Sequence, residues 1–168
     1  SHLLAGGRGG AFRVWRLGPT STGHLTPYIQ VQLSANPRRT PSSSRFVVPP
    51  DVTAVCCISQ NVAIVGTDTG VLATYSLHTP EVKAFQSGKS ADRLAQWALD
   101  DPRLWRGEPP DTGELFQILS VRRSPDHEPG VIVCGLRTGR AVVFDTRSGG
   151  RALGITNSDV SPSVGYCQ

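Results

Sequence analysis

Methionine is absent from the 168-residue sequence, and lysine occurs only twice, at Lys83 and Lys89. Because Met is missing even at position 1, we expect an internal segment or a processed product of a longer protein. No apolar run approaches the roughly 18 residues that span a bilayer. The first ten residues also lack the charged start and apolar block of a signal peptide. We therefore expect a soluble chain with no membrane segment.

Familiar catalytic and metal-binding motifs are also missing from the sequence. It contains no Gly-x-Ser-x-Gly elbow, phosphate-binding P-loop, His-Glu-x-x-His or EF-hand pattern. The Gly-Gly-Arg-Gly-Gly run at 6–10 could suggest a phosphate cradle or an RNA-binding element, but no helix follows it, and we interpret it as a turn. The histidines are widely separated: His2, His24, His78 and His127. We predict a protein that is not an enzyme, with no cofactor, no metal and no small-molecule substrate.

Cysteines are few and do not form a metal-binding pattern. Cys56, Cys57 and Cys134 lie in apolar runs, Cys167 lies near the end, and no Cys-x-x-Cys pair occurs. We expect buried, reduced thiols, which favour a cytoplasmic or nuclear location.

The formal charge is +4, and nearly all of the positive charge is arginine. The only adjacent arginine pairs are Arg38–Arg39 and Arg122–Arg123, and no basic block resembles a nucleic-acid-binding tail. Association with RNA or DNA through surface arginines remains an alternative that the sequence does not favour.

The sequence is rich in turn-forming residues, with 18 Gly and 13 Pro, which favours β-structure over helix. Segments 2–17, 62–77 and 131–146 align without a gap, and each fits a strand, a turn and a second strand. A first glycine ends the apolar run, a second closes the turn, and an aromatic residue follows five positions later. The three columns are Gly6, Gly66 and Gly135; Gly10, Gly70 and Gly139; and Trp15, Tyr75 and Phe144.

Physical requirements explain these residue types. The second glycine suits a turn that needs positive φ, and the aromatic side chain would fill the gap between neighbouring sheets. Apolar runs at 62–65 and 131–134 are typical of strands covered on both faces. A further strand is predicted before the second and third copies, at 52–58 and 115–121, where it would be the innermost strand of its sheet. Another is predicted after each copy, at 28–33, 82–85 and 152–156, as the outer strand.

This four-stranded unit and its glycine and aromatic columns resemble the WD repeat. The resemblance implies an all-β fold, a partial β-propeller of about three four-stranded antiparallel blades. No copy has an intact Trp-Asp dipeptide, and only Phe144–Asp145 keeps the acid. The copies are also 60 and 69 residues apart, whereas a WD blade usually takes about 40 to 45. We therefore expect insertions.

The predicted organisation is one propeller segment. Residues 1–35 would end a blade, 51–88 and 113–158 would form blades, 89–112 a helical insertion, and 159–168 the start of another blade. The Pro- and Ser-rich stretch 34–50 is predicted to be a projecting loop. Within the insertion, Ser90 would cap a short helix that Pro102 ends. Because a ring usually needs four or more blades, the others would come from further sequence or another chain.

The predicted function is a non-enzymatic scaffold that holds other proteins in a larger assembly. Candidate contact residues are Trp97 and Trp105, with packing on the propeller rim as the alternative role. The run Phe144-Asp145-Thr146-Arg147 is similar to the box by which WD-repeat substrate receptors attach to the adaptor of cullin-4 ubiquitin ligases. Phe144 stands where that box usually has Trp. This resemblance implies that Asp145 and Arg147 orient each other and that Arg147 reaches the adaptor. The same four residues also occur in propellers with no ligase connection, where Asp145 and Arg147 would simply pair near a blade edge.

Overall fold

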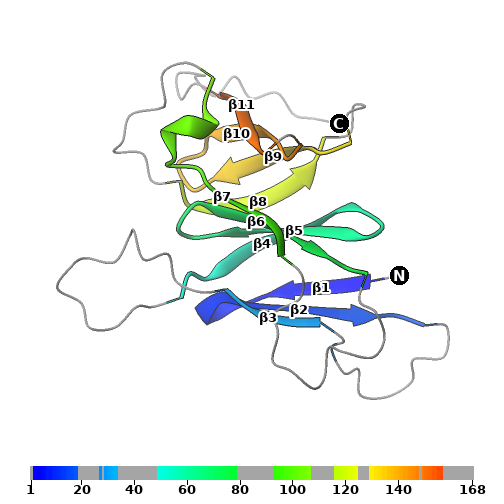
Figure 1. Cartoon of the computed structure of the whole chain (residues 1–168). Helices are drawn as coiled ribbons and strands as arrows, with labels where there is room; N and C mark the ends of the chain where they lie inside the picture. The colour runs from blue at the N-terminus through cyan, green and yellow to red at the C-terminus, as the bar shows by residue number, and fades with distance from the viewer. Residues whose placement is uncertain are drawn as a thin grey trace, which may run out of the picture.

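The computed structural model describes residues 2–18, 27, 29–33, 49–78, 93–106, 116–124, 129–147 and 149–156. These residues form three antiparallel sheets of three, four and four strands (Figure 1). Helical structure among them is limited to two single 3-10 turns, η1 (Arg8–Gly10) and η2 (Pro102–Leu104). The predicted all-β fold of sheets resembling propeller blades is therefore confirmed.

Each sheet is a meander, in which every strand pairs with the next strand along the chain. The first sheet contains β1 (His2–Gly6), β2 (Ala11–Arg16) and β3 (Ile29–Gln32). The second contains β4 (Val52–Ser59), β5 (Val62–Thr67), β6 (Val71–Ser76) and β7 (Arg93–Ala98). The third contains β8 (Ile118–Arg123), β9 (Val131–Leu136), β10 (Ala141–Asp145) and β11 (Arg151–Ile155).

The three aligned sequence segments occupy equivalent positions in the three sheets. They form the hairpins β1–β2, β5–β6 and β9–β10. In each hairpin, the first glycine of the repeat pairs with an equivalent residue of the second strand. Gly66 pairs with Leu72, and Gly135 pairs with Ala141. The turn glycines Gly10, Gly70 and Gly139 have φ of 79°, 77° and 83°, values that a side chain with a Cβ rarely adopts.

The sheets stack face to face (Figure 1), and a separate apolar core fills each of the two interfaces. Between the first and second sheets, the rings of Phe12 and Tyr75 lie 5.5 Å apart. Between the second and third, Trp97 packs against Phe144 with ring centroids 5.3 Å apart. In the second and third copies of the repeat, the aromatic residue, Tyr75 or Phe144, thus faces the preceding sheet, whereas Trp15 of the first copy is half-buried.

Burial differs between the middle sheet and its two neighbours. Strands β5 and β6 are buried along nearly their whole length, because Ile64 and Leu72 face the third sheet while Val65 and Ala73 face the first. In β10, by contrast, buried residues alternate with half-buried ones. The sequence expectation of covered strands concerned 62–65 and 131–134: in the first run only Val62 is half-buried, and in the second only Val133 is. Both runs are thus largely buried.

The first glycine of the repeat allows the next sheet to approach closely. A Cβ at Gly66 would lie 2.7 Å from Cγ2 of Ile118, which belongs to the innermost strand of the third sheet. A Cβ at Gly6 would meet the side chain of Val52 on β4 in the same way. The hydroxyl of Thr53 also donates to the carbonyl of Ile118 across the second interface. Gly6 and Gly66 of this column therefore serve the contact between sheets, whereas a Cβ at Gly135 would meet Ser120 of its own sheet.

The predicted helix at 90–101 is wrong where the structure describes it, because 93–98 form strand β7 and pair with β6. A helix over these residues would gather Ala91, Leu94, Ala95 and Ala98 on one face, without Trp97. In the strand, Ala95 and Trp97 alternate toward the third sheet and Leu94 is exposed. Burial of the large indole ring favours the extended conformation. Residues 93–98 thus belong to the sheet and not to a helical insertion.

Strand β7 is the structural counterpart of β3. The residue after each strand, Leu33 or Leu99, donates its amide hydrogen to the carbonyl of the turn glycine, Gly10 or Gly70, at 2.9 Å. The outer place in the second sheet is therefore occupied by 93–98, and the outer strand predicted at 82–85 lies outside the described residues. So do most of the predicted loop at 34–50 and the whole of 159–168. The described part of the chain contains no helix long and apolar enough to cross a membrane.

Candidate functional site

The run from Phe144 to Arg147 lies at the end of β10, on the outer side of the third sheet. Phe144 is fully buried against Trp97 and forms part of the interface between sheets. The following residues form a turn, in which both the amide and the hydroxyl of Thr146 donate to the carbonyl of Gly130, at 2.9 and 2.8 Å. The sheet therefore fixes the position from which Asp145 and Arg147 extend.

Asp145 and Arg147 orient each other. The guanidinium of Arg147 donates through Nε to Oδ1 of Asp145 at 2.9 Å and through Nη2 to Oδ2 at 2.8 Å. The backbone amide of Arg147 donates to Oδ1 as well, at 2.9 Å. These hydrogen bonds, with the positive charges of Arg147 and Arg106, hold the pKa of Asp145 below its ordinary value. The Arg147 side chain is 45% exposed, so part of it faces solvent.

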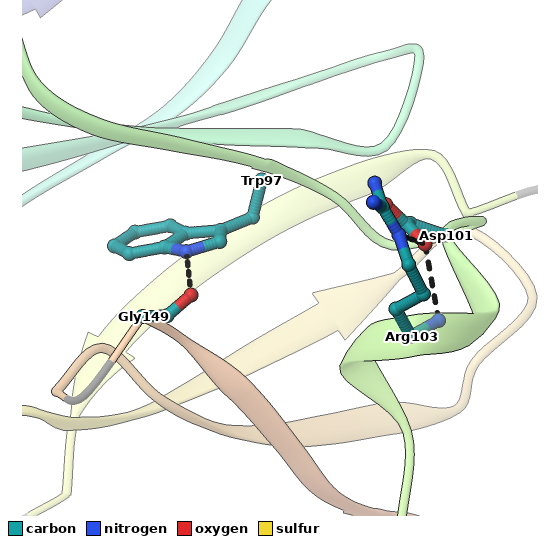
Figure 2. A network of polar contacts seen from close by, with 4 residues as sticks. All are labelled: Trp97, Asp101, Arg103 and Gly149. Atoms are coloured by element: carbon teal, nitrogen blue, oxygen red, sulfur yellow. Dashed lines mark hydrogen bonds and ion pairs between the residues drawn. The ribbon is translucent and has the colours of Figure 1, made fainter.

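The same geometry recurs outside the predicted box. Figure 2 shows Arg103 folded over Asp101, with its Nε 2.9 Å from Oδ1 and its Nη2 2.6 Å from Oδ2. Its backbone amide also donates to Oδ1, at 3.0 Å. An Asp-x-Arg pair that closes on its own turn is therefore a local stabilising feature.

Both candidate tryptophans take part in packing between the second and third sheets. Trp97 is only 7% exposed. Its indole N–H donates to the carbonyl of Gly149 at 2.7 Å, and Figure 2 shows the ring lying over that turn. Trp105 is half-buried; its N–H donates to the carbonyl of Leu99 at 2.9 Å, and its ring lies 5.8 Å from that of Phe116. This geometry agrees with the alternative role given above, packing within the propeller. A role of the two tryptophans in partner binding stays a prediction.

Two exposed arginines that the sequence reasoning did not select lie beside this turn. Arg151 is the cross-strand neighbour of Asp145 in the β10–β11 pair. Arg106 follows Trp105, which forms an isolated parallel bridge with Ala152 of β11. Their proximity depends on the order of the strands and on one bridge between residues far apart in sequence. The sequence showed only that the chain contains many arginines. It did not show which of them lie close together in the folded chain.

The described cysteines differ in environment. Cys134 is buried, and burial raises its pKa to about 12. Cys56 is half-buried and Cys57 exposed, so the expectation of buried thiols is wrong for Cys57. Side chains alternate across a strand, and β4 is an edge strand whose two faces are each covered over only part of their length, which leaves Cys57 exposed. Among the described residues, no three His, Cys, Asp or Glu side chains are grouped as metal ligands would be.

Comparison with models of protein families and with curated protein sequences gives no match. Among solved structures, the chain is similar to the crystal structure of Raptor from Chaetomium thermophilum, with a TM-score of 0.52 and 17% sequence identity. The chain has a propeller-like fold. The alignment covers 94% of this chain and 11% of the Raptor chain, so this chain spans only a small part of that protein's length. At such low identity the similarity shows the fold alone.

Proposed function

We propose that this chain is part of a non-enzymatic propeller scaffold that binds other proteins within a larger assembly, in the cytoplasm or nucleus. The observation that carries the proposal is the repetition of one sheet module. Equivalent glycines contact the first strand of the next sheet at both interfaces, and at each interface the aromatic residue of the repeat packs against an aromatic ring of the preceding sheet. Stacked modules of this kind build extended, rigid surfaces, and such surfaces suit the binding of other proteins.

The proposal is tested by purifying the tagged protein that contains this chain from its native cells and following its apparent mass through size exclusion. A scaffold is expected to elute in a fixed ratio with other proteins, far above the mass that the same protein shows under denaturing conditions. Nuclease treatment distinguishes a nucleic-acid-associated propeller, whose complexes would fall apart. Elution of the chain alone at its own mass, before and after mild cross-linking, would contradict the proposal.

A second candidate function is substrate reception in a cullin-4 ubiquitin ligase, through the run from Phe144 to Arg147. The observation that favours it is the doubly bonded Asp145–Arg147 pair, in which Arg147 keeps 45% of its side chain exposed. Phe144 occupies the place of the usual Trp and, being buried, supports the turn from below. Arg147 is then the residue that would reach the adaptor.

The structure supplies a matched control for this second function. Arg103→Ala removes a guanidinium held by the same hydrogen bonds, but outside the box. If the ligase function holds, Arg147→Ala loses the adaptor in affinity purification, while Arg103→Ala and the wild type recover it equally. Recovery of the adaptor with Arg147→Ala, or no recovery with the wild type, would remove the ligase function and leave the general scaffold.

A further inference from the structure

In the part of the chain that the structure describes, the outer edge of the third sheet carries exposed positive charge around one carboxylate, that of Asp145. We propose that Arg106, Arg147, Arg151 and Leu153, here called the rim surface, form a docking site for an acidic peptide segment of a partner protein. This inference rests on the proposed scaffold function, because it gives the chemistry of one partner that such a scaffold would bind.

Backbone pairing brings these residues together from three segments. The bridge between Trp105 and Ala152 places the segment after β7 alongside β11. In Figure 1, the turn that contains η2 lies next to β10 and β11 at the same end of the molecule. Ala152 is buried toward the second sheet, so its neighbours Arg151 and Leu153 extend to the other side, and both are exposed.

Among the described residues, the charges on the rim surface do not cancel. Three arginines lie around Asp145 along the chain's pairing: Arg147 is bonded to it, Arg151 is its backbone partner in the neighbouring strand, and Arg106 acts on it through its charge. In this part of the chain, three guanidiniums and one carboxylate leave a local excess of two positive charges. No hydrogen bond or ion pair among the described residues engages the guanidinium of Arg106 or Arg151, and both side chains are exposed. These two groups are therefore available to carboxylates from outside.

An apolar residue lies within the same surface. Leu153 occupies a bulge of β11 and is 43% exposed. A leucine beside arginines suits a segment in which acidic and apolar residues alternate, because the guanidiniums bond carboxylates while Leu153 buries an apolar side chain. Nucleic acid fits less well, since a phosphate backbone requires a continuous positive track, and Asp145 interrupts this one. The rim surface therefore favours an acidic protein segment.

The test measures binding of a short fluorescein-labelled peptide of alternating Glu and Leu to the full chain by anisotropy, at low and at physiological salt. The rim variant is Arg106→Gln with Arg151→Gln. The matched control is Arg122→Gln with Arg123→Gln, which removes the same charge from exposed residues of β8, at the opposite edge of the same sheet. Circular dichroism and thermal unfolding establish that both variants keep the fold.

We expect the rim variant to weaken peptide binding roughly tenfold at low salt and the control to change it less than about twofold, because exposed charge pairs act over a Debye length of about 10 Å. Equal weakening by both variants would show general attraction to a basic protein and overturn the proposal. Absence of binding to the wild type would overturn it as well. Tighter binding of a poly-dT oligonucleotide, reduced by the rim variant, would assign the surface to nucleic acid instead. None of these results affects the size-exclusion test, so the scaffold function can stand if the rim surface fails.

Discussion

The ring of Phe144 on β10 packs against the indole of Trp97 on β7, with centroids 5.3 Å apart and an angle of 57° between the ring planes. This contact joins the outer part of the second sheet to the third. The indole N–H adds a hydrogen bond to the carbonyl of Gly149, in the turn before β11. Trp97 thus holds the turn that presents the Asp145–Arg147 pair.

Removing the Trp97 ring should destabilise the fold strongly. Trp97→Ala leaves a cavity between two sheets and is expected to lower the free energy of unfolding by about 3 to 5 kcal/mol. Trp97→Phe keeps an aromatic ring and loses the hydrogen bond to Gly149, with a smaller expected cost of about 1 to 2 kcal/mol. Urea unfolding followed by far-ultraviolet circular dichroism measures both. Equal costs for the two variants would show that the ring does not fill the interface.

A methyl group at Gly66 should be harmful, although its backbone conformation is ordinary for a strand. The added Cβ would press on Ile118 of the next sheet, and overpacking of this kind costs about 1 to 3 kcal/mol. The matched control is Gly154→Ala, because a Cβ at that strand position meets nothing within 4 Å. Thermal unfolding of the two variants gives the comparison. A Gly154→Ala variant as unstable as Gly66→Ala would indicate a general strand effect.

Acid should weaken the turn at Asp145. The folded-state pKa of this carboxyl lies below its unfolded value, chiefly because of the hydrogen bond from Arg147. The carboxylate therefore stabilises the fold above the unfolded value, near pH 4, and this contribution disappears as the pH falls through the folded pKa. The wild type should therefore lose more stability between pH 6 and pH 2 than either Asp145→Asn or Arg147→Ala, and the two variants should reduce this loss by the same amount. Measurement of the free energy of unfolding against pH checks this. If both variants lose as much stability as the wild type, the Asp145–Arg147 pair is not the source of the effect.

The thiols should react in a fixed order. Burial raises the pKa of Cys134 to about 12, so this thiol is both covered and protonated at neutral pH. Cys57 is exposed, although partial burial raises its pKa too, and its alkylation should speed up as the pH is raised. Iodoacetamide labelling, read by peptide mass spectrometry, is expected to modify Cys57 in the folded chain and Cys134 only after denaturant is added. Labelling of Cys134 first would show that the interface between the second and third sheets opens readily.

The sequence predicted the repeated hairpins well because their signals are local. The turn itself requires glycines such as Gly70 and Gly139, because φ is positive there. Burial requires the apolar runs beside them. The role of Gly66 could not be predicted in the same way, because it depends on Ile118 in another sheet. Strand β7 could not be predicted because the spacing of its apolar residues also fits a helix. Only the position of Phe144 in the third sheet shows why the Trp97 side chain must face that sheet.

The candidate site was predictable only in part. The Asp145–Arg147 pair was expected from the resemblance to the box of WD-repeat substrate receptors, and it lies within one turn. Arg106 and Arg151 come from segments that meet through the bridge at Trp105, and no local pattern specifies that bridge. The rim surface therefore needed the order and alignment of the strands.

The central claim is that equivalent sheets stack face to face through the glycine column. A double-mutant cycle between Gly66→Ala and Ile118→Ala tests it directly by comparing free energies of unfolding. The account predicts that Gly66→Ala costs about 2 kcal/mol in the wild type and at least about 1 kcal/mol less in the Ile118→Ala background, where the obstructing side chain is shortened. Strictly additive costs would mean that these residues do not touch, and would contradict the stacking.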